Sequence, residues 1–362
     1  MNSSVTLKNK WLPWGGALLA LGLLAGCATK PLKPKGYAFF PAEPDEPRIQ
    51  FLTSFGNESD LHEKGSFSDF VLGSSKVFRP LWKPYGISAR RGQLCVADTQ
   101  ANNVAFIDIA AGRIRYLRPS GPGEIKSSLS AVVDAEENCY VSDGERGQVL
   151  VFNKAGNFHG AIGKTGDMKT AGLALVGDKL YVCDLKNQRV QAFDRKSRAP
   201  IATYPANPAE DQGRLFGPTN VAVDKDGRVY VSDSRGFRVQ VYNADGSHLR
   251  TIGGQGLAPG RFALPKGIGV DREGITYVVD AATAVVQMFD AEGRLLMFFG
   301  EPNTSGPGGL YLPAGLCVDY ENVEYYKKYV APGHQIEYLI FVVSQVGDQK
   351  VGVYGYLKKP TT

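Results

Sequence analysis

Short segments in which hydrophobic and polar residues alternate run through most of the chain after residue 47. In residues 217–254 this alternation predicts four strands, at 220–223, 228–232, 238–242 and 248–252. The sequences DKDG and NADG join the first two and the last two strands, and their glycines supply the positive φ of a tight hairpin turn. The pattern therefore predicts a four-stranded antiparallel unit.

This unit recurs along the chain. A shift of 47 residues places its landmarks on those of the next unit: Pro218 on Pro265, Asp224 on Asp271, Asp233 on Asp280, Gly246 on Gly293 and Gly253 on Gly300. Five complete units begin near Pro84, Leu129, Gly172, Pro218 and Pro265, and a sixth begins at Pro313. Four-stranded units of about 40 to 50 residues that repeat radially form a β-propeller. The sequence thus predicts an all-β chain with six blades.

The sixth unit is incomplete, because the chain ends at Thr362, where its fourth strand would begin. Residues 49–55 alternate and are followed by Gly56, as residues 248–252 are followed by Gly253. An N-terminal strand that pairs with the last blade would remove two exposed sheet edges. We therefore expect residues 49–55 to close the ring.

The repeated units resemble a known family. They read P-x-G-[IV]-x-V-D, then [VI]-Y-V-x-D, then R-V-Q-V-[YF], which resembles the NHL repeat across residues 47–359 and most closely in the fourth and fifth units. The resemblance implies a six-bladed β-propeller. NHL units often carry T-G-N-x-R after the second strand, whereas this chain reads DLKNQRV, DSRGFRV and DAATAVV there. A binding surface shared by the whole family is therefore not supported.

The first 26 residues have the organisation of a bacterial signal peptide. Lys8 and Lys10 precede an apolar stretch at 11–24, which is shorter than a typical transmembrane helix. It leads into Leu-Ala-Gly-Cys, which resembles the lipobox of bacterial lipoproteins and predicts a lipid on Cys27; an ordinary secretory signal is the alternative. Ala28 stands where an aspartate retains some lipoproteins in the inner membrane, so the sequence favours an outer-membrane anchor.

The predicted organisation has four parts. Residues 1–26 form the signal peptide, and residues 27–46 contain the lipidated cysteine and a proline-rich, extended tether. Residues 47–359 form the propeller, including a segment at 57–83 that fits no blade and holds a predicted short helix at 66–73. Residues 360–362 form a tail.

Charge and cysteine spacing argue against several classes of function. The formal net charge of +5 falls to +3 when residues 1–26 are removed with their two lysines, which does not indicate a nucleic-acid partner. The remaining cysteines stand singly, without the spacing of zinc, haem or redox motifs. We expect no cofactor, no metal and buried free thiols, with pairing of two of them as the alternative, at Cys95, Cys139, Cys183 and Cys317.

One aspartate ends the second strand of each of the first five units. A ring of catalytic carboxylates is one interpretation, but catalysis needs such groups only where the substrate binds. Aspartate at this position commonly accepts hydrogen bonds from the backbone amides of the following turn. The structural interpretation is therefore favoured for Asp98, Asp143, Asp184, Asp233 and Asp280.

Two groups of side chains are candidates for binding. The loops after the second strands and the connections between blades share one face of a propeller, and basic and aromatic residues there suit an acidic or peptidic partner. The alternative is that the arginines pair with blade carboxylates and the phenylalanines pack between blades. The candidates are Lys186, Arg189, Arg235, Phe237 and Arg238, with Phe216, Arg261 and Phe262 nearby.

The second group is an insertion in the sixth unit. Residues 320–335 replace a two-residue turn between its first and second strands, and long insertions in compact folds are often functional. Tyrosine and lysine suit an interface, and a solvated loop is the alternative. The candidates are Tyr320, Tyr325, Tyr326, Lys327 and Lys328.

These observations predict a non-catalytic binding or scaffolding lipoprotein of the cell envelope, with a protein, peptide or polysaccharide partner and a membrane contact through its lipid. The alternative is an exported metal-dependent hydrolase or lyase. Propeller enzymes of that kind place ligands where the innermost strands begin, and only Asn220 suits a metal there. The four histidines fall in separate parts of the chain, so they predict no imidazole-built metal site.

Overall fold

The computed structural model describes residues 36–42, 44–62, 79–302 and 306–358, which belong to one compact unit. The expected signal peptide, Cys27, the helix at 66–73 and the tail at 360–362 lie outside these residues. Within the described part, no helix is both long and apolar enough to cross a membrane.

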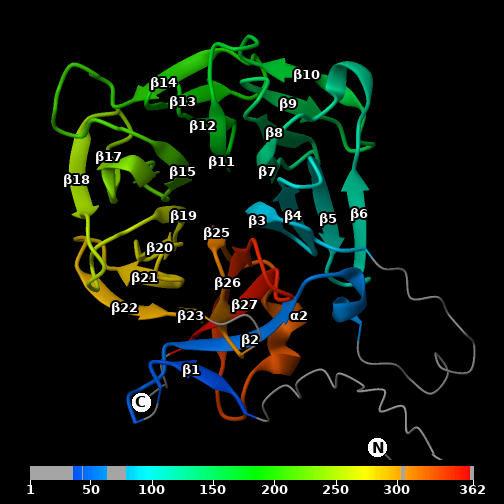
Figure 1. Cartoon of the computed structure of the whole chain (residues 1–362), viewed down its shortest axis with the longest axis vertical. Helices are drawn as coiled ribbons and strands as arrows, with labels where there is room; N and C mark the ends of the chain where they lie inside the picture. Colours follow the sequence, from blue (N-terminus) through cyan, green and yellow to red (C-terminus); the bar gives the residue numbers. More distant parts are fainter. Residues whose placement is uncertain (1–35, 43, 63–78, 303–305, 359–362) are drawn as a thin grey trace, which may run out of the picture. The chain divides into compact units, whose positions relative to one another are not determined.

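The described residues form six blades arranged around a centre (Figure 1). Blades 1 to 5 are four-stranded antiparallel sheets built from consecutive strands. Blade 1 contains β3 (Pro84–Arg90), β4 (Gln93–Asp98), β5 (Asn103–Asp108) and β6 (Arg113–Leu117). Blade 2 contains β7 (Ser128–Val133), β8 (Cys139–Asp143), β9 (Gln148–Phe152) and β10 (Phe158–Ile162). Blade 3 contains β11 (Thr170–Val176), β12 (Lys179–Asp184), β13 (Arg189–Asp194) and β14 (Pro200–Tyr204).

Blade 4 contains β15 (Pro218–Val223), β16 (Val229–Asp233), β17 (Arg238–Tyr242) and β18 (His248–Gly253). These bounds confirm the four strands predicted for residues 217–254, to within two residues at each end. Blade 5 contains β19 (Pro265–Val270), β20 (Thr276–Asp280), β21 (Val285–Phe289) and β22 (Leu295–Phe299).

Blade 6 is assembled from both ends of the chain. Its inner strands are β25 (Pro313–Asp319), β26 (Ile336–Ser344) and β27 (Val351–Leu357), and β2 (Ile49–Phe55) pairs antiparallel with β27. This pairing confirms the predicted closure of the ring. A fifth strand, β1 (Ala38–Phe40), pairs with the outer edge of β2. The prediction that residues 27–46 are all tether is therefore wrong for 38–40, which belong to the blade.

The remaining elements are short. The insertion of blade 6 contains α2 (Val323–Tyr326) and a 3-10 turn at Lys327–Tyr329, and β23 (Glu301–Pro302) pairs with β24 (Gly309–Leu310) before blade 6 begins. Other 3-10 turns lie at Glu58–Leu61, Gly121–Gly123 and Ser234–Gly236.

Alternation along the strands gives each blade two apolar faces, which pack against the neighbouring blades. Six clusters of buried hydrophobic residues result in the described part of the chain, one between each pair of neighbours. Between blades 6 and 1, Leu52 and Phe55 of β2 share a cluster with Ile87 and Leu94. The closing strand is therefore held by its side chains as well as by its backbone hydrogen bonds.

Two faces of the ring follow from the strand order. The innermost strands β3, β7, β11, β15, β19 and β25 all begin on one face. We call it the connection face, because it carries the connections between blades and the loops between second and third strands. The opposite face, which carries the hairpins between first and second and between third and fourth strands, is the hairpin face. The insertion at 320–335 lies on the hairpin face.

The aspartates that end the second strands hold the connection face together. In blade 4 the Asp233 carboxylate accepts hydrogen bonds from the amides of Phe216 at 3.0 Å and Gly217 at 2.7 Å. It is fully buried, and Arg238 lies 3.3 Å away. Equivalent bonds to the amides that precede each first strand are made by Asp98, Asp143, Asp184 and Asp280. The predicted structural role of these carboxylates is confirmed.

Candidate functional site

The mouth of the central channel lies on the connection face, where a propeller enzyme would hold its ligands. Glycines occupy four of the six equivalent positions on the inner strands. A Cβ would lie 2.6 Å from the Leu129 carbonyl at Gly86, 2.7 Å from the Thr219 carbonyl at Gly172 and 2.6 Å from the Ala314 carbonyl at Gly267. Gly315 meets the Tyr85 carbonyl in the same way. The inner strands thus touch through their backbones and leave little room for ligating side chains.

Only blades 2 and 4 carry side chains at this constriction. Ser130 Oγ accepts a hydrogen bond from the Leu173 amide, and Asn220 is half-buried. Across blade 6, Lys266 Nζ lies 3.2 Å from the Tyr85 hydroxyl. No group of three or more His, Cys, Asp or Glu side chains that could hold a metal ion occurs in the described ranges.

On the hairpin-face side of this constriction the channel widens into a cavity of about 270 Å³. Its walls are mainly aliphatic, from residues such as Leu175, Val223 and Val270. Arg90 lines the cavity, but its guanidinium donates to the backbone carbonyls of Asp134 and Ala135. No Asp, Glu or His lines the cavity, so it offers no evident acid or base.

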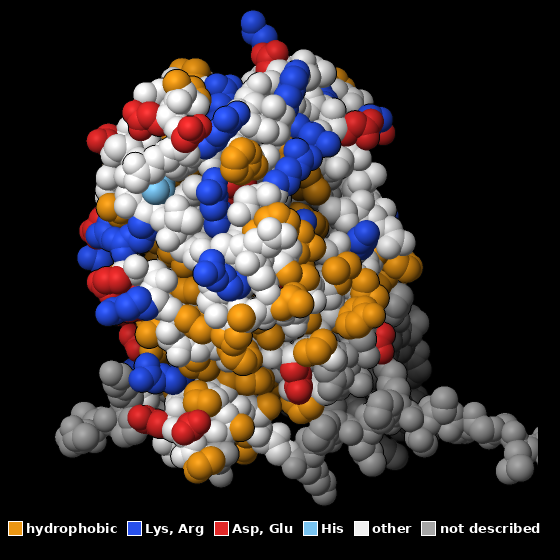
Figure 2. Space-filling view, turned by 60° about the vertical axis from the view of Figure 1, so that its left-hand side comes forward, with side chains coloured by type: hydrophobic (Ala, Val, Ile, Leu, Met, Phe, Trp, Pro, Cys, Tyr) orange, Lys and Arg blue, Asp and Glu red, His pale blue; other side chains and the backbone are white. Residues whose placement is uncertain are grey.

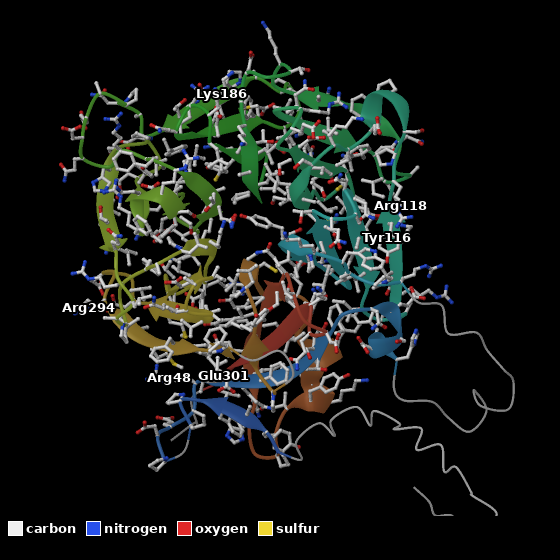
Figure 3. All side chains as sticks on the ribbon, viewed as in Figure 1. Arg48, Tyr116, Arg118, Lys186, Arg294 and Glu301 are labelled. Carbon is white, nitrogen blue, oxygen red and sulfur yellow. The ribbon has the colours of Figure 1, made fainter. Side chains whose placement is uncertain are left out.

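The predicted basic residues of the connection face divide into two kinds. Arg189 Nε lies 3.5 Å from Asp184, and Arg238 Nε lies 3.3 Å from Asp233, so each arginine pairs with the aspartate of its own blade. Lys186 and Arg235 are exposed, and Lys186 Nζ donates to the Gly166 carbonyl (Figure 3). Phe237 is half-buried in a left-handed turn, with φ of 54°. Among these predicted residues, Lys186 and Arg235 are therefore exposed and make no ion pair with a described residue.

The two nearby phenylalanines also differ. Phe262 is fully buried, with its ring 5.6 Å from that of Phe289. Phe216 is 40% exposed, and its ring centroid lies 5.7 Å from the Arg214 guanidinium and 5.3 Å from that of Arg238. A similar pair on blade 1 places Arg118 4.7 Å from the Tyr116 ring (Figure 3). Arginine stacked on an aromatic ring is weakly hydrated and retains its charge.

The two faces differ in how their cations are compensated. On the hairpin face, ion pairs join Arg91 to Glu321, Lys154 to Glu137, Arg195 to Asp134, Arg228 to Asp226 and Arg294 to Asp290. The connection face has fewer, chiefly the arginine–aspartate pairs described above and Lys126 with Glu124. Cations of the connection face that make no ion pair with any described residue include Lys83, Arg118, Arg146, Lys164, Lys169, Lys186, Arg214, Arg235, Arg261 and Lys350. The hairpin face also has such cations, among them Lys179, Arg198, Arg272 and Lys358.

Exposed apolar side chains also lie on the connection face, and the sequence analysis missed most of them. At the junction of blades 6 and 1, Trp82 is 50% exposed, Tyr311 46% and Val346 43%. Leu257, in the connection between blades 4 and 5, is 76% exposed. All lie in loops without hydrophobic periodicity, so no sequence pattern marks them. Figure 2 shows hydrophobic and cationic side chains gathered in neighbouring areas on the side where blades 4 and 5 come forward.

The insertion at 320–335 is folded onto the ring. Tyr326 is buried, and Tyr320 lies beneath the Arg272 guanidinium at 4.0 Å. Tyr325, Lys327 and Lys328 are exposed, and Lys327 pairs with Glu324 at 2.6 Å. The predicted group of five side chains is therefore split between the core and the surface.

Gln50 of the closing strand fastens this insertion. Its buried amide donates to the Tyr329 carbonyl at 2.9 Å and accepts from the Ala331 amide at 3.0 Å. Asn322 bonds to the Gly92 amide at 2.6 Å and to the Arg90 carbonyl. The insertion thus joins the closing strand to blades 6 and 1.

A buried carboxylate lies beside the insertion. Asp271 accepts hydrogen bonds from the hydroxyls of Tyr338 at 2.8 Å and Tyr277 at 3.4 Å, and burial raises the pKa of its carboxyl group. The equivalent Asp134 in blade 2 instead has Arg195 at 2.9 Å. Asp271 is only 4% exposed, so it stabilises the interface of blades 5 and 6 rather than facing a substrate.

The four cysteines that the structure describes are free thiols. Cys95, Cys139 and Cys183 are buried, as predicted, whereas Cys317 is only partly buried. Burial raises the pKa of Cys183, so its thiol is uncharged and unreactive at neutral pH.

Comparisons with known proteins agree with this architecture. The NHL repeat model matches residues 217–242, which cover β15 to β17. No curated protein sequence matches the chain. A structural genomics protein of unknown function from Bacteroides thetaiotaomicron is similar in structure, with a TM-score of 0.58 and 20% identity over 85% of this chain and 75% of that one.

Two further solved structures have weaker similarity. Virginiamycin B lyase from Staphylococcus aureus, with quinupristin, has a TM-score of 0.51 and 12% identity over 75% of this chain and 94% of that one. A chain of a nidogen/laminin complex has a TM-score of 0.51 and 14% identity over 62% of this chain and 82% of that one. These identities show the fold alone. The chain is a six-bladed β-propeller with an NHL repeat in its fourth blade.

Proposed function

We propose that this chain is a non-catalytic binding or scaffolding lipoprotein of the bacterial cell envelope, which presents its connection face to a protein, peptide or polysaccharide partner. One observation carries the proposal: within the described part of the chain, most ion pairs lie on the hairpin face, whereas few cations of the connection face are paired. Exposed aromatic residues on the same face add the apolar area typical of interfaces.

Anchoring through Cys27, with the outer membrane as destination, is part of the same proposal. The test is metabolic labelling with a palmitate analogue in cells that produce the wild-type chain or Cys27→Ser. The proposal expects labelled wild-type protein in the outer-membrane fraction and no label on the variant. Equal labelling of both would refute the lipid assignment.

Binding is tested by crosslinking in intact cells, followed by purification of the full chain from detergent-solubilised envelopes. The comparison sample carries Lys164→Glu, Lys169→Glu and Lys186→Glu on the connection face. The proposal expects an identified partner that is retained by the wild type and depleted by these changes. Retention of nothing beyond a control preparation without the chain would overturn it.

A metal-dependent hydrolase or lyase is the alternative, and the position of Asn220 at the channel mouth is its one favourable observation. Elemental analysis of the purified chain separates the two. A stoichiometric divalent ion that is lost in Asn220→Ala would support the enzyme and contradict the binding proposal.

A further inference from the structure

Three loops at the connection-face end of blade 4 carry exposed side chains. Arg214 and Phe216 lie in the connection from blade 3, Arg235 in the loop between β16 and β17, and Leu257 and Arg261 in the connection to blade 5. All five are exposed. We call these residues the blade-4 patch.

The first two residues of the patch are held in fixed positions. The Phe216 amide donates to Asp233, and Arg238 donates to both the Asp233 carboxylate and the Arg214 carbonyl. The guanidiniums of Arg214 and Arg238 lie 5.7 Å and 5.3 Å from the centroid of the Phe216 ring. The charge of Arg238 is compensated by Asp233, whereas that of Arg214 is not compensated by any described carboxylate. The aromatic ring and one free guanidinium are therefore preorganised.

The other two arginines are positioned by packing against glycines. A Cβ on Gly217 would lie 2.7 Å from Arg235 Cγ, and one on Gly256 would lie 3.1 Å from Arg261 Cβ. The glycines thus let the arginine side chains lie close to the backbone, and a Cβ on Gly254 would lie 2.5 Å from Nη1 of Arg261. Neither guanidinium makes an ion pair with a described residue.

The loop that carries Leu257 is also anchored. Buried Gln287 accepts a hydrogen bond from the Gly260 amide at 2.7 Å and donates to the Arg261 carbonyl at 2.7 Å. Phe262 is fully buried behind it. Leu257 nevertheless remains 76% exposed at the tip. The exposed leucine on this anchored loop adds apolar surface beside the arginine of the same loop.

We infer that the blade-4 patch binds an acidic segment of a partner protein, with carboxylates at the three arginines and an apolar side chain against Phe216 and Leu257. This deepens the proposed function and rests on it. The charge is complementary, because three uncompensated guanidiniums suit carboxylates, which they contact through paired hydrogen bonds. Glu210 and Asp211 precede Arg214 in the same loop and leave an excess of cations. An acidic polysaccharide would satisfy the arginines but supply no apolar side chain.

The test places a photo-crosslinking amino acid at Leu257 in the full chain within intact cells, and identifies the adduct by mass spectrometry. Two variants are compared with the parent. One carries Arg214→Glu, Arg235→Glu and Arg261→Glu in the patch. The matched control carries Lys179→Glu, Lys225→Glu and Lys358→Glu, three exposed residues of the hairpin face with the same change in charge.

The inference expects a crosslinked protein segment that contains Asp or Glu beside an apolar residue. Its yield should fall at least tenfold in the patch variant and stay unchanged in the control. Replacement of the segment's acidic residues by lysine should restore crosslinking to the patch variant. Three results would overturn the inference: an adduct to glycan or lipid, an adduct whose yield is the same in the patch variant as in the parent, or no adduct at Leu257. If the crosslinking at Leu257 gives one of these results but the envelope purification still yields a partner, only the inference about the blade-4 patch is wrong. If neither experiment yields a partner, the proposed function is wrong as well.

Discussion

Blades 4 and 6 build the same sheet in different ways. Blade 4 consists of four consecutive strands. Its Asp233 accepts hydrogen bonds from two backbone amides and forms an ion pair with Arg238. Blade 6 takes strands from both ends of the chain, and Ser344 stands opposite Pro313 where Asp233 stands opposite Pro218. Ser344 Oγ accepts one amide hydrogen bond, from Tyr311 at 3.2 Å.

The two blades differ in which of their side chains are needed to hold the sheet together. In blade 6, Gln50 and the insertion hold a junction that no peptide bond closes. Blade 4 is closed by its own hairpins, so the side chains of its loops are available for other contacts. Stability and binding are therefore assigned to different parts of the ring, and mutations can separate them.

The largest effect is expected from Leu52→Asp in the closing strand. Leu52 packs with Ile336 and Val353, and an unpaired carboxylate there would cost about 5 kcal/mol or more of unfolding free energy. Urea denaturation measures this loss, and hydrogen exchange should show faster exchange of β27 amides than of β17 amides. Thr53→Asp, at the neighbouring half-buried position, is the control and should cost much less. Equal loss of protection in β17 and β27 would contradict a separate junction.

The second prediction compares the two residues that close the connection face. Asp233→Ala leaves two amides and Arg238 without their acceptor, so we expect a loss of about 3 kcal/mol. Ser344→Ala removes one neutral hydrogen bond and should cost about 1 kcal/mol. Thermal and urea unfolding of both variants provide the measurement. A larger loss of unfolding free energy for Ser344→Ala than for Asp233→Ala would show that blade 6 depends on this side-chain acceptor at least as much as blade 4 does.

The third prediction concerns two buried glutamines that fasten loops. Gln50→Ala should destabilise the chain by about 2 kcal/mol and expose residues 320–335 to protease, because two hydrogen bonds to that segment are lost. Gln287→Ala is the matched control, since Gln287 fastens the loop at 255–262 by the same two kinds of bond. Each variant should be cleaved in its own loop. Cleavage at 255–262 in Gln50→Ala would disprove the assignment.

The smallest effect is a pH dependence at the interface of blades 5 and 6. Burial raises the pKa of Asp271 in the folded chain, so its contribution to stability is full below the ordinary carboxyl pKa and is lost as pH rises through the raised value. The stability advantage of the wild type over Asp271→Asn should therefore shrink between acidic and neutral pH. Urea unfolding of both proteins across that pH range measures this difference in unfolding free energy. A difference that grows as pH rises would contradict a raised pKa of Asp271 in the folded chain.

The fold was predictable because the repeat appears in the sequence several times. Landmarks such as Asp233 and Gly253 recur in register, and the alternation of residues 49–55 identified the closing strand. The sequence did not predict β1, because three residues beside Pro41 are too few to show an alternation of hydrophobic and polar positions. The prolines of that segment are equally typical of an extended tether.

The candidate site was less predictable, because pairing depends on distances that sequence does not contain. Arg235 and Arg238 both follow Asp233, yet only Arg238 lies beside its carboxylate. Tyr325 and Tyr326 are adjacent, but one is exposed and the other is buried. The exposure of Leu257 depends on the anchor at Gln287, which lies in a different strand.

The most direct test of the account measures binding and stability in the same variant. Arg214→Glu, Arg235→Glu and Arg261→Glu should reduce partner recovery from envelopes at least tenfold while the unfolding midpoint remains that of the wild type. Recovery that is unchanged, or lost only together with stability, would contradict a binding surface on blade 4.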